Sequence, residues 1–141
     1  MTLWIWFSLI MYVIGIVGLG MIGNSTAVLC TMHGYKTICY VRSEEKIPQY
    51  RAAFDRMYDE MIAQGIMTKA EAEICGTYLK YVTSYADMAE CTFIFEAITE
   101  DLKLKEACYS EIEKNWLAPS NAFSSAMPYR LQINRYLSES L

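Results

Sequence analysis

The sequence predicts an α/β fold in which a mostly parallel β-sheet carries helices on both faces. Short apolar runs alternate with longer amphipathic segments, and a glycine-rich turn joins the first run to the first amphipathic segment. Strands that alternate with helices pair in parallel, because each helix returns the chain to the same edge of the sheet. The 141 residues are 54% hydrophobic and 20% charged, which suits one domain with an ordinary core and argues against disorder.

Each expected element is marked by its periodicity and by the residues that end it. Expected strands are short apolar runs, whereas expected helices carry apolar residues three and four positions apart. Gly34 and Gly65 are typical helix ends, and Thr68 with Glu71 has the spacing of a capping box. In chain order we expect a strand at 12–17, a helix at 21–33, a strand at 37–41, a long helix at 44–64, a helix from 68, strands at 78–84 and 91–98, and a helix at 101–114.

Charge and cysteine content exclude several classes of function. The net charge is −4, and the sequence contains no block of like charge. This argues against a nucleic-acid partner, which would require a basic face. His33 is the only histidine and ends the first expected helix, so we expect neither a metal site nor a catalytic role for it. Five cysteines, none spaced as C-x-x-C, are typical of reduced thiols in a cytoplasmic protein. They are Cys30, Cys39, Cys75, Cys91 and Cys108.

Residues 1–10 are apolar and rich in aromatic side chains, and we interpret them as an extension that precedes one domain at 11–141. A signal peptide is not expected, because the first basic residue is Lys36 and such peptides begin with positive charge. The apolar run is also shorter than the roughly 20 residues that cross a bilayer. The alternative is membrane association through an interfacial anchor formed by Trp4, Trp6 and Phe7.

The segment GLGMIG at residues 18–23 carries glycines at the spacing G-x-G-x-x-G. It lies between an expected strand and an expected helix, which is the context of a Rossmann-like dinucleotide-binding unit. The first glycine permits a tight turn, the second lets a pyrophosphate approach the backbone, and the third lets the helix pack closely on the strand. The helix then directs unpaired N–H groups at the phosphates. The expected cofactor-binding residues of this segment are Gly18, Leu19, Gly20, Met21, Ile22 and Gly23. The alternative is that the glycines form a tight turn that binds no ligand.

Four segments lie in the order expected of one protein family: IGIVGLGMIG, GYKTICYVRSEE, QGIMTKAEAE and YADMAECTFIFEAITEDLKLK. With them, residues 13 to about 115 resemble the N-terminal NAD-binding domain of the 3-hydroxyacyl-CoA dehydrogenases, whose relatives include L-gulonate dehydrogenase and lambda-crystallin. The resemblance implies a long inserted helix pair, NAD as cofactor, and hydride transfer between the 3-hydroxyl of an acyl-CoA and NAD, as in fatty-acid β-oxidation. The alternatives are a non-catalytic nucleotide-binding module, half of a split enzyme, or a sugar-acid dehydrogenase.

The resemblance also implies roles for residues in the second half of the chain. Ala97, Glu100 and Lys105 would line the nicotinamide half of the cofactor site, although Glu100 and Lys105 alone could be a solvated surface pair. Ser124 would hydrogen-bond the substrate hydroxyl, and Asn121 would lie near the nicotinamide ribose; the alternative is a serine-rich loop without a role. The family's catalytic histidine and glutamate follow that serine, so we expect a domain incomplete at its C-terminus, which forms a homodimer or is completed by a C-terminal half.

Val41 occupies the position where the resemblance places an acid that binds the ribose hydroxyls of NAD. It lies 21 residues after Gly20, close to the spacing expected of that acid. A valine accepts no hydrogen bond, and losing a charged acceptor costs about 1.5–3 kcal/mol. Arg42, beside Ser43, could instead hold a 2′-phosphate. The sequence therefore predicts a nicotinamide cofactor, with NADP as an alternative to NAD.

Overall fold

The computed structural model describes residues 12–98, 101–115 and, for their backbone, 123–124. Expectations for residues 1–10, Glu100 and Asn121 therefore lie outside the described residues, as does any statement about the Ser124 side chain. Among the described residues, no helix is both long enough and apolar enough to cross a membrane.

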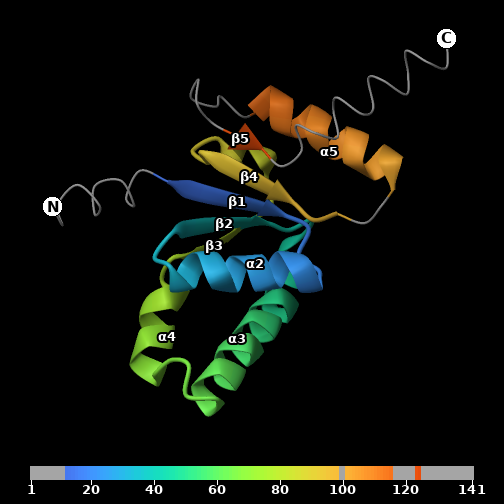
Figure 1. Cartoon of the computed structure of the whole chain (residues 1–141). Coiled ribbons are helices and arrows are strands. Elements are labelled where there is room, and N and C mark those ends of the chain that lie inside the picture. The colour runs from blue at the N-terminus through green and yellow to red at the C-terminus, as the bar shows by residue number, and fades with distance from the viewer. Residues whose placement is uncertain (1–11, 99–100, 116–122, 125–141) are drawn as a thin grey trace, which may run out of the picture.

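Five described strands form one sheet in the order β3-β2-β1-β4-β5, and every neighbouring pair is parallel. The arrows of β1, β2 and β4 in Figure 1 run in the same direction. The expected α/β fold with a parallel sheet is confirmed. The strands are β1 (Val13–Val17), β2 (Lys36–Tyr40), β3 (Leu79–Val82), β4 (Phe93–Glu96) and β5 (Phe123–Ser124).

Helices cover both faces of this sheet, as expected. In Figure 1, α2, α3 and α4 lie on one side of the strands and α5 lies on the other. The inserted helix pair, α3 and α4, connects β2 to β3. The helices are α2 (Met21–Met32), α3 (Ile47–Ala63), α4 (Lys69–Gly76) and α5 (Leu102–Asn115), and two short 3-10 turns are η1 (Glu44–Lys46) and η2 (Tyr85–Met88).

The two faces of the sheet carry separate hydrophobic cores. Successive residues of a strand point to opposite faces, so Ile16 packs in the core beneath α2, α3 and α4, and its neighbour Val17 packs in the core beneath α5. Phe54 from α3 and Ile112 from α5 are buried in these two cores, respectively. The sheet is therefore fixed from both sides.

The prediction of one long helix at 44–64 is wrong for its first turn. The structure forms the separate turn η1 and begins α3 only at Ile47. Pro48 lies in the first turn of α3, where its missing N–H is tolerated, whereas further inside a helix its ring would clash with the carbonyl four residues earlier. The capping box is confirmed: Thr68 Oγ1 accepts from the Glu71 N–H at 3.1 Å, and Glu71 Oε2 accepts from the Thr68 N–H at 2.7 Å.

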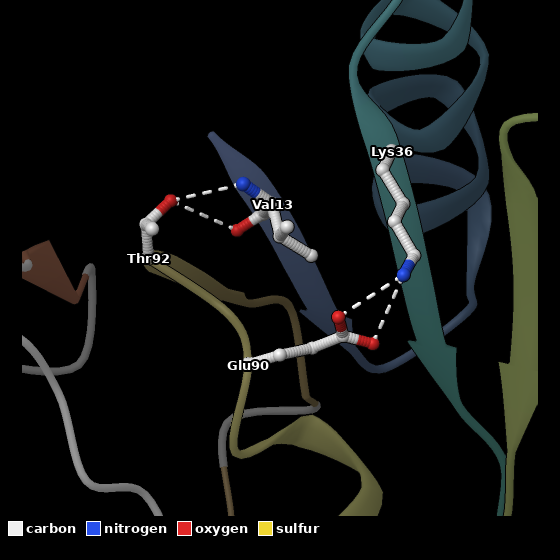
Figure 2. Close-up of polar contacts among 4 residues, drawn as sticks. All are labelled: Val13, Lys36, Glu90 and Thr92. Carbon is white, nitrogen blue, oxygen red and sulfur yellow. Dashed lines mark hydrogen bonds and ion pairs between the residues drawn. The ribbon is translucent and has the colours of Figure 1, made fainter. Parts of the chain in front are cut away.

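The amino ends of the strands are joined by polar contacts (Figure 2). Thr92 Oγ1 accepts from the Val13 N–H at 3.0 Å and donates to the Val13 carbonyl at 3.1 Å. The Lys36 ammonium donates to both Glu90 carboxylate oxygens, at 3.0 and 3.1 Å. That ion pair is about half exposed, so it contributes at most about 1 kcal/mol. These contacts hold together the amino ends of β1, β2 and β4, at the end of the sheet opposite the glycine turn.

Candidate functional site

A cleft of about 480 Å³ opens at the carboxyl ends of β1, β2 and β4. The chain runs from β1 to β2 on one side and reaches β4 on the other, so the strand order reverses at β1. Ligands of open α/β sheets bind at such a reversal. The cleft therefore lies at the position where folds of this type bind their ligands.

The three glycines of the turn have three different steric environments. Gly18 has φ +95°, and a Cβ there would lie 2.6 Å from the carbonyl carbon and oxygen of Ala97. A Cβ on Gly23 would lie 1.8 Å from the Gly18 carbonyl oxygen, so α2 packs directly against the turn. A Cβ on Gly20 would meet no atom of the described residues within 4 Å. The space above Gly20 is thus open to a ligand, while its two neighbours fix the backbone that borders the space.

The first turn of α2 faces this open space with its backbone donors. Gly20 is the N-cap residue, and no side chain of the described residues caps the helix there. Behind the turn, the Asn24 amide is buried and donates to the Leu19 carbonyl at 3.3 Å. Helix N-termini present unpaired N–H groups and partial positive charge. Such a terminus suits a diphosphate.

Met21 and Ile22 are not among the residues that line the cleft, and their side chains are 81% and 67% exposed. Their predicted contact with a cofactor would therefore be made by the backbone N–H groups of the helix start. Gly18, Leu19 and Gly20 do line the cleft.

The exit of β2 forms a second wall. Val41 lines the cleft with an exposed fraction of 2%, and its N–H donates to the Val82 carbonyl at 2.8 Å. Arg42 is exposed and also lines the cleft, together with Lys46 from η1 and Tyr50 from α3. The sequence did not single out Lys46 or Tyr50, which reach the cleft from η1 and α3, the elements that follow β2 in the chain.

The exit of β4 and helix α5 form the third wall. Ala97 lines the cleft, and its N–H donates to the Val17 carbonyl at 2.8 Å. From α5, Leu104, Cys108 and Glu111 line it as well. The sequence did not single out these positions, although their spacing of three and four residues marks one face of a helix.

Lys105 lies within the protein and does not line the cleft. Its side chain is 3% exposed, and its ammonium lies 3.7 Å from Glu96 Oε2. The Glu96 carboxylate also accepts from the Tyr109 hydroxyl at 2.8 Å and from the Ile98 N–H. The alternative of a solvated surface charge is therefore wrong for Lys105. Its contact with the nicotinamide half of a cofactor stays a prediction.

Aromatic and thiol groups make the wall between β2 and α5 apolar. The rings of Tyr40 and Tyr85 stack with centroids 4.0 Å apart and planes 18° from parallel. Burial raises the pKa of the Tyr85 phenol and the pKa of the Cys108 thiol, so both groups are neutral near pH 7. Tyr40, Tyr85 and Cys108 all line the cleft, which suits a flat heteroaromatic ring.

His33 lies at the far end of α2 from the glycine turn, where it is the C-cap residue. Its Nδ1 donates to the Leu29 carbonyl at 2.8 Å, which fits the expected role of a helix end. Within the described ranges, no three metal-ligating side chains gather as a metal ion would require. All five cysteines are free thiols, and all except Cys30 are buried.

The family model for the NAD-binding domain of 3-hydroxyacyl-CoA dehydrogenase matches residues 13–129. The chain belongs to this family. The NAD-binding domain is 20% identical over 98 residues to a probable 3-hydroxybutyryl-CoA dehydrogenase of Deinococcus radiodurans, covering 70% of this chain and 35% of that protein. It is 21% identical over 112 residues to a 3-hydroxybutyryl-CoA dehydrogenase of Mycobacterium tuberculosis, covering 79% of this chain and 39% of that protein.

Solved structures of the same kind share the fold of this NAD-binding domain. FadB2 of Mycobacterium tuberculosis superimposes with a TM-score of 0.77 at 20% identity. The (S)-3-hydroxybutyryl-CoA dehydrogenase PaaH1 of Ralstonia eutropha superimposes with a TM-score of 0.74 at 25% identity. Both matches cover 81% of this chain and 40% of the other chain. The chain thus spans about two fifths of the length of these relatives.

Proposed function

We propose that this chain supplies the dinucleotide-binding part of an oxidoreductase that transfers hydride between the 3-hydroxyl carbon of an acyl-CoA and a nicotinamide. The observation that supports this most strongly is the open space at Gly20, bordered by two glycines that tolerate no Cβ. Bound nicotinamide would accept or release the hydride. The protein's own contribution is to hold and orient the dinucleotide.

Each wall of the cleft has a part in that task. The N–H groups at the start of α2 would hold the diphosphate. The adenosine half would lie against the apolar wall that Tyr40, Tyr85 and Cys108 form together. Enclosing a ring in an apolar cleft with few polar groups gives affinity and fixes its orientation.

A non-catalytic module is the second candidate function. The only histidine, His33, caps the far end of α2, and general-base catalysis typically contributes about 10²–10⁴-fold to a rate. The acyl-CoA site and the base would then come from further protein, either a second copy of this chain or a complementing C-terminal half. The five free thiols support a reducing compartment such as the cytoplasm for this protein.

Titration of the purified chain with NADH and with NADPH, followed by nicotinamide fluorescence, tests the binding function. We expect saturable binding of at least one of the two, and competition by ADP-ribose. If neither binds, the proposed function is wrong. Reduction of acetoacetyl-CoA then separates the two candidates: turnover by the chain alone favours the enzyme, and background rates despite tight dinucleotide binding favour the module.

A further inference from the structure

The adenosine-ribose end of the cleft carries cations where a site for NAD requires an acceptor. In Rossmann-like sites an acidic side chain after the second strand accepts hydrogen bonds from the ribose hydroxyls. Val41 holds that position here, and its side chain packs in the core beneath α2 and α3. The backbone N–H of Val41 is engaged by Val82. The Val41 side chain therefore offers no acceptor to a 2′-hydroxyl and carries no negative charge that would repel a 2′-phosphate.

Two cations from different elements line the cleft beside Val41. Arg42 follows β2 directly and is exposed, so its guanidinium is free to turn toward a ligand. Lys46 lines the same cleft from η1, and Tyr50 adds a phenol from the first turns of α3. A guanidinium binds phosphate through two parallel N–H bonds, and an ammonium adds a second charge.

The acidic side chains nearby do not line this wall of the cleft. Glu44 and Glu45 belong to η1 and are exposed, but neither lines the cleft. Glu111 lines the α5 wall, where its carboxylate accepts from the Lys114 ammonium at 3.1 Å. Of the residues that line this wall of the cleft, the charged ones are Arg42 and Lys46, and both are cations.

We infer that the ribose end of this cleft is built for a 2′-phosphate, so that this member of an NAD-binding family binds NADP(H) more tightly than NAD(H). The inference rests on the proposed function, because it assigns a preference within the same cleft. Val41 removes the acid that selects NAD, and Arg42 with Lys46 supplies the charge that selects NADP.

Parallel titrations of the full chain with NADPH and NADH test the inference. We expect NADPH to bind about tenfold more tightly than NADH, the effect of one charge-assisted contact. Arg42→Ala should weaken NADPH binding about tenfold and change NADH binding less than about twofold, because only NADPH carries the 2′-phosphate. Raising the salt concentration should reduce the preference for NADPH, because the contact is exposed to solvent.

Arg56→Ala is the matched control, because Arg56 is an exposed arginine of α3 that does not line the cleft. It removes the same charge and should leave both affinities unchanged. Val41→Asp should reverse the preference by supplying the missing acceptor. Since Val41 is buried, circular dichroism checks whether the Val41→Asp protein folds. If it does not, the Arg42→Ala variant, which changes an exposed residue, decides whether the cleft binds a 2′-phosphate.

The outcomes separate this inference from the function on which it rests. Equal or tighter binding of NADH, with Arg42→Ala affecting both nucleotides alike, would overturn the 2′-phosphate site and leave the proposed function standing. Binding of neither nucleotide would overturn both. Tighter binding of NADPH that is lost in Arg42→Ala and kept in Arg56→Ala would establish the site.

Discussion

Replacing Gly23 by alanine should separate the turn from the helix that packs on it. The added Cβ would lie 1.8 Å from the Gly18 carbonyl oxygen, whereas real Cβ atoms essentially never approach within 3.0 Å. Helix α2 would have to retreat by at least about 1.2 Å, the difference between these two distances. Backbone meets backbone here, so no side chain can rotate away. Overpacking of this kind costs about 3 kcal/mol.

Gly20→Ala is the informative partner of that variant. A Cβ at Gly20 meets nothing within 4 Å in the part of the chain that the structure describes, and the Gly20 backbone has φ −73° and ψ −162°, which any residue can adopt. Alanine is a poorer N-cap than glycine but restricts the unfolded chain, so the two effects offset to within about 0.5 kcal/mol. The same Cβ would project into the space proposed for the diphosphate. We expect binding to weaken at least tenfold, or about 1.4 kcal/mol.

Urea denaturation and dinucleotide titration of both variants provide the assay. Gly76→Ala in α4 is the matched control, because its added Cβ also meets no described residue within 4 Å and no residue of α4 lines the cleft. Gly23→Ala should lose both stability and binding, Gly20→Ala binding alone, and Gly76→Ala neither. A Gly20→Ala protein that binds dinucleotide normally would refute the role assigned to the turn.

Three further predictions concern stability. Lys105→Met should lower the free energy of unfolding by about 3 kcal/mol, because it leaves the buried Glu96 carboxylate without its cation; a loss below about 1 kcal/mol in urea denaturation would show that the pair is solvated. Thr68→Ala should cost about 1 kcal/mol by removing the capping box of α4, and an unchanged urea midpoint would contradict this. Burial raises the pKa of Tyr58 to about 12, above its ordinary value of about 10, so the neutral phenol is favoured in the folded state. The stability that Tyr58 contributes is thus complete below about pH 10 and is lost as the pH rises toward 12. Melting temperatures measured from pH 9 to 12 should fall less steeply for Tyr58→Phe than for the unmodified chain, and parallel curves would count against the assignment.

Much of the fold is predictable from the sequence because local signals and tertiary packing agree. Apolar runs become β1, β2, β3 and β4 with ends shifted by only a few residues, and Gly34 and Gly65 take positive φ values of 80° and 73° after α2 and α3. The glycine turn is also predictable, because the spacing G-x-G-x-x-G is typical of a turn with these steric requirements.

What the sequence could not give is the chemistry of residues brought together by the fold. Lys105 looks like a surface charge until α5 packs over β4 and places Glu96 beside it. Lys46 and Tyr50 come from η1 and α3, and only the folded chain brings them to the same cleft as the glycine turn. Such juxtapositions depend on long-range packing, and periodicity carries no information about them.

The most direct test of the account is the response of the backbone amides at the glycine turn to a dinucleotide. Amide chemical shifts of the ¹⁵N-labelled chain would be followed during titration with NADPH, and with NADH in parallel. The account predicts that the largest changes occur at residues 19–23 and Arg42, and that the amides at the opposite edge, near Lys36 and Lys80, stay unchanged. Saturable binding with no change at residues 19–23 would contradict the claim that this turn holds the diphosphate.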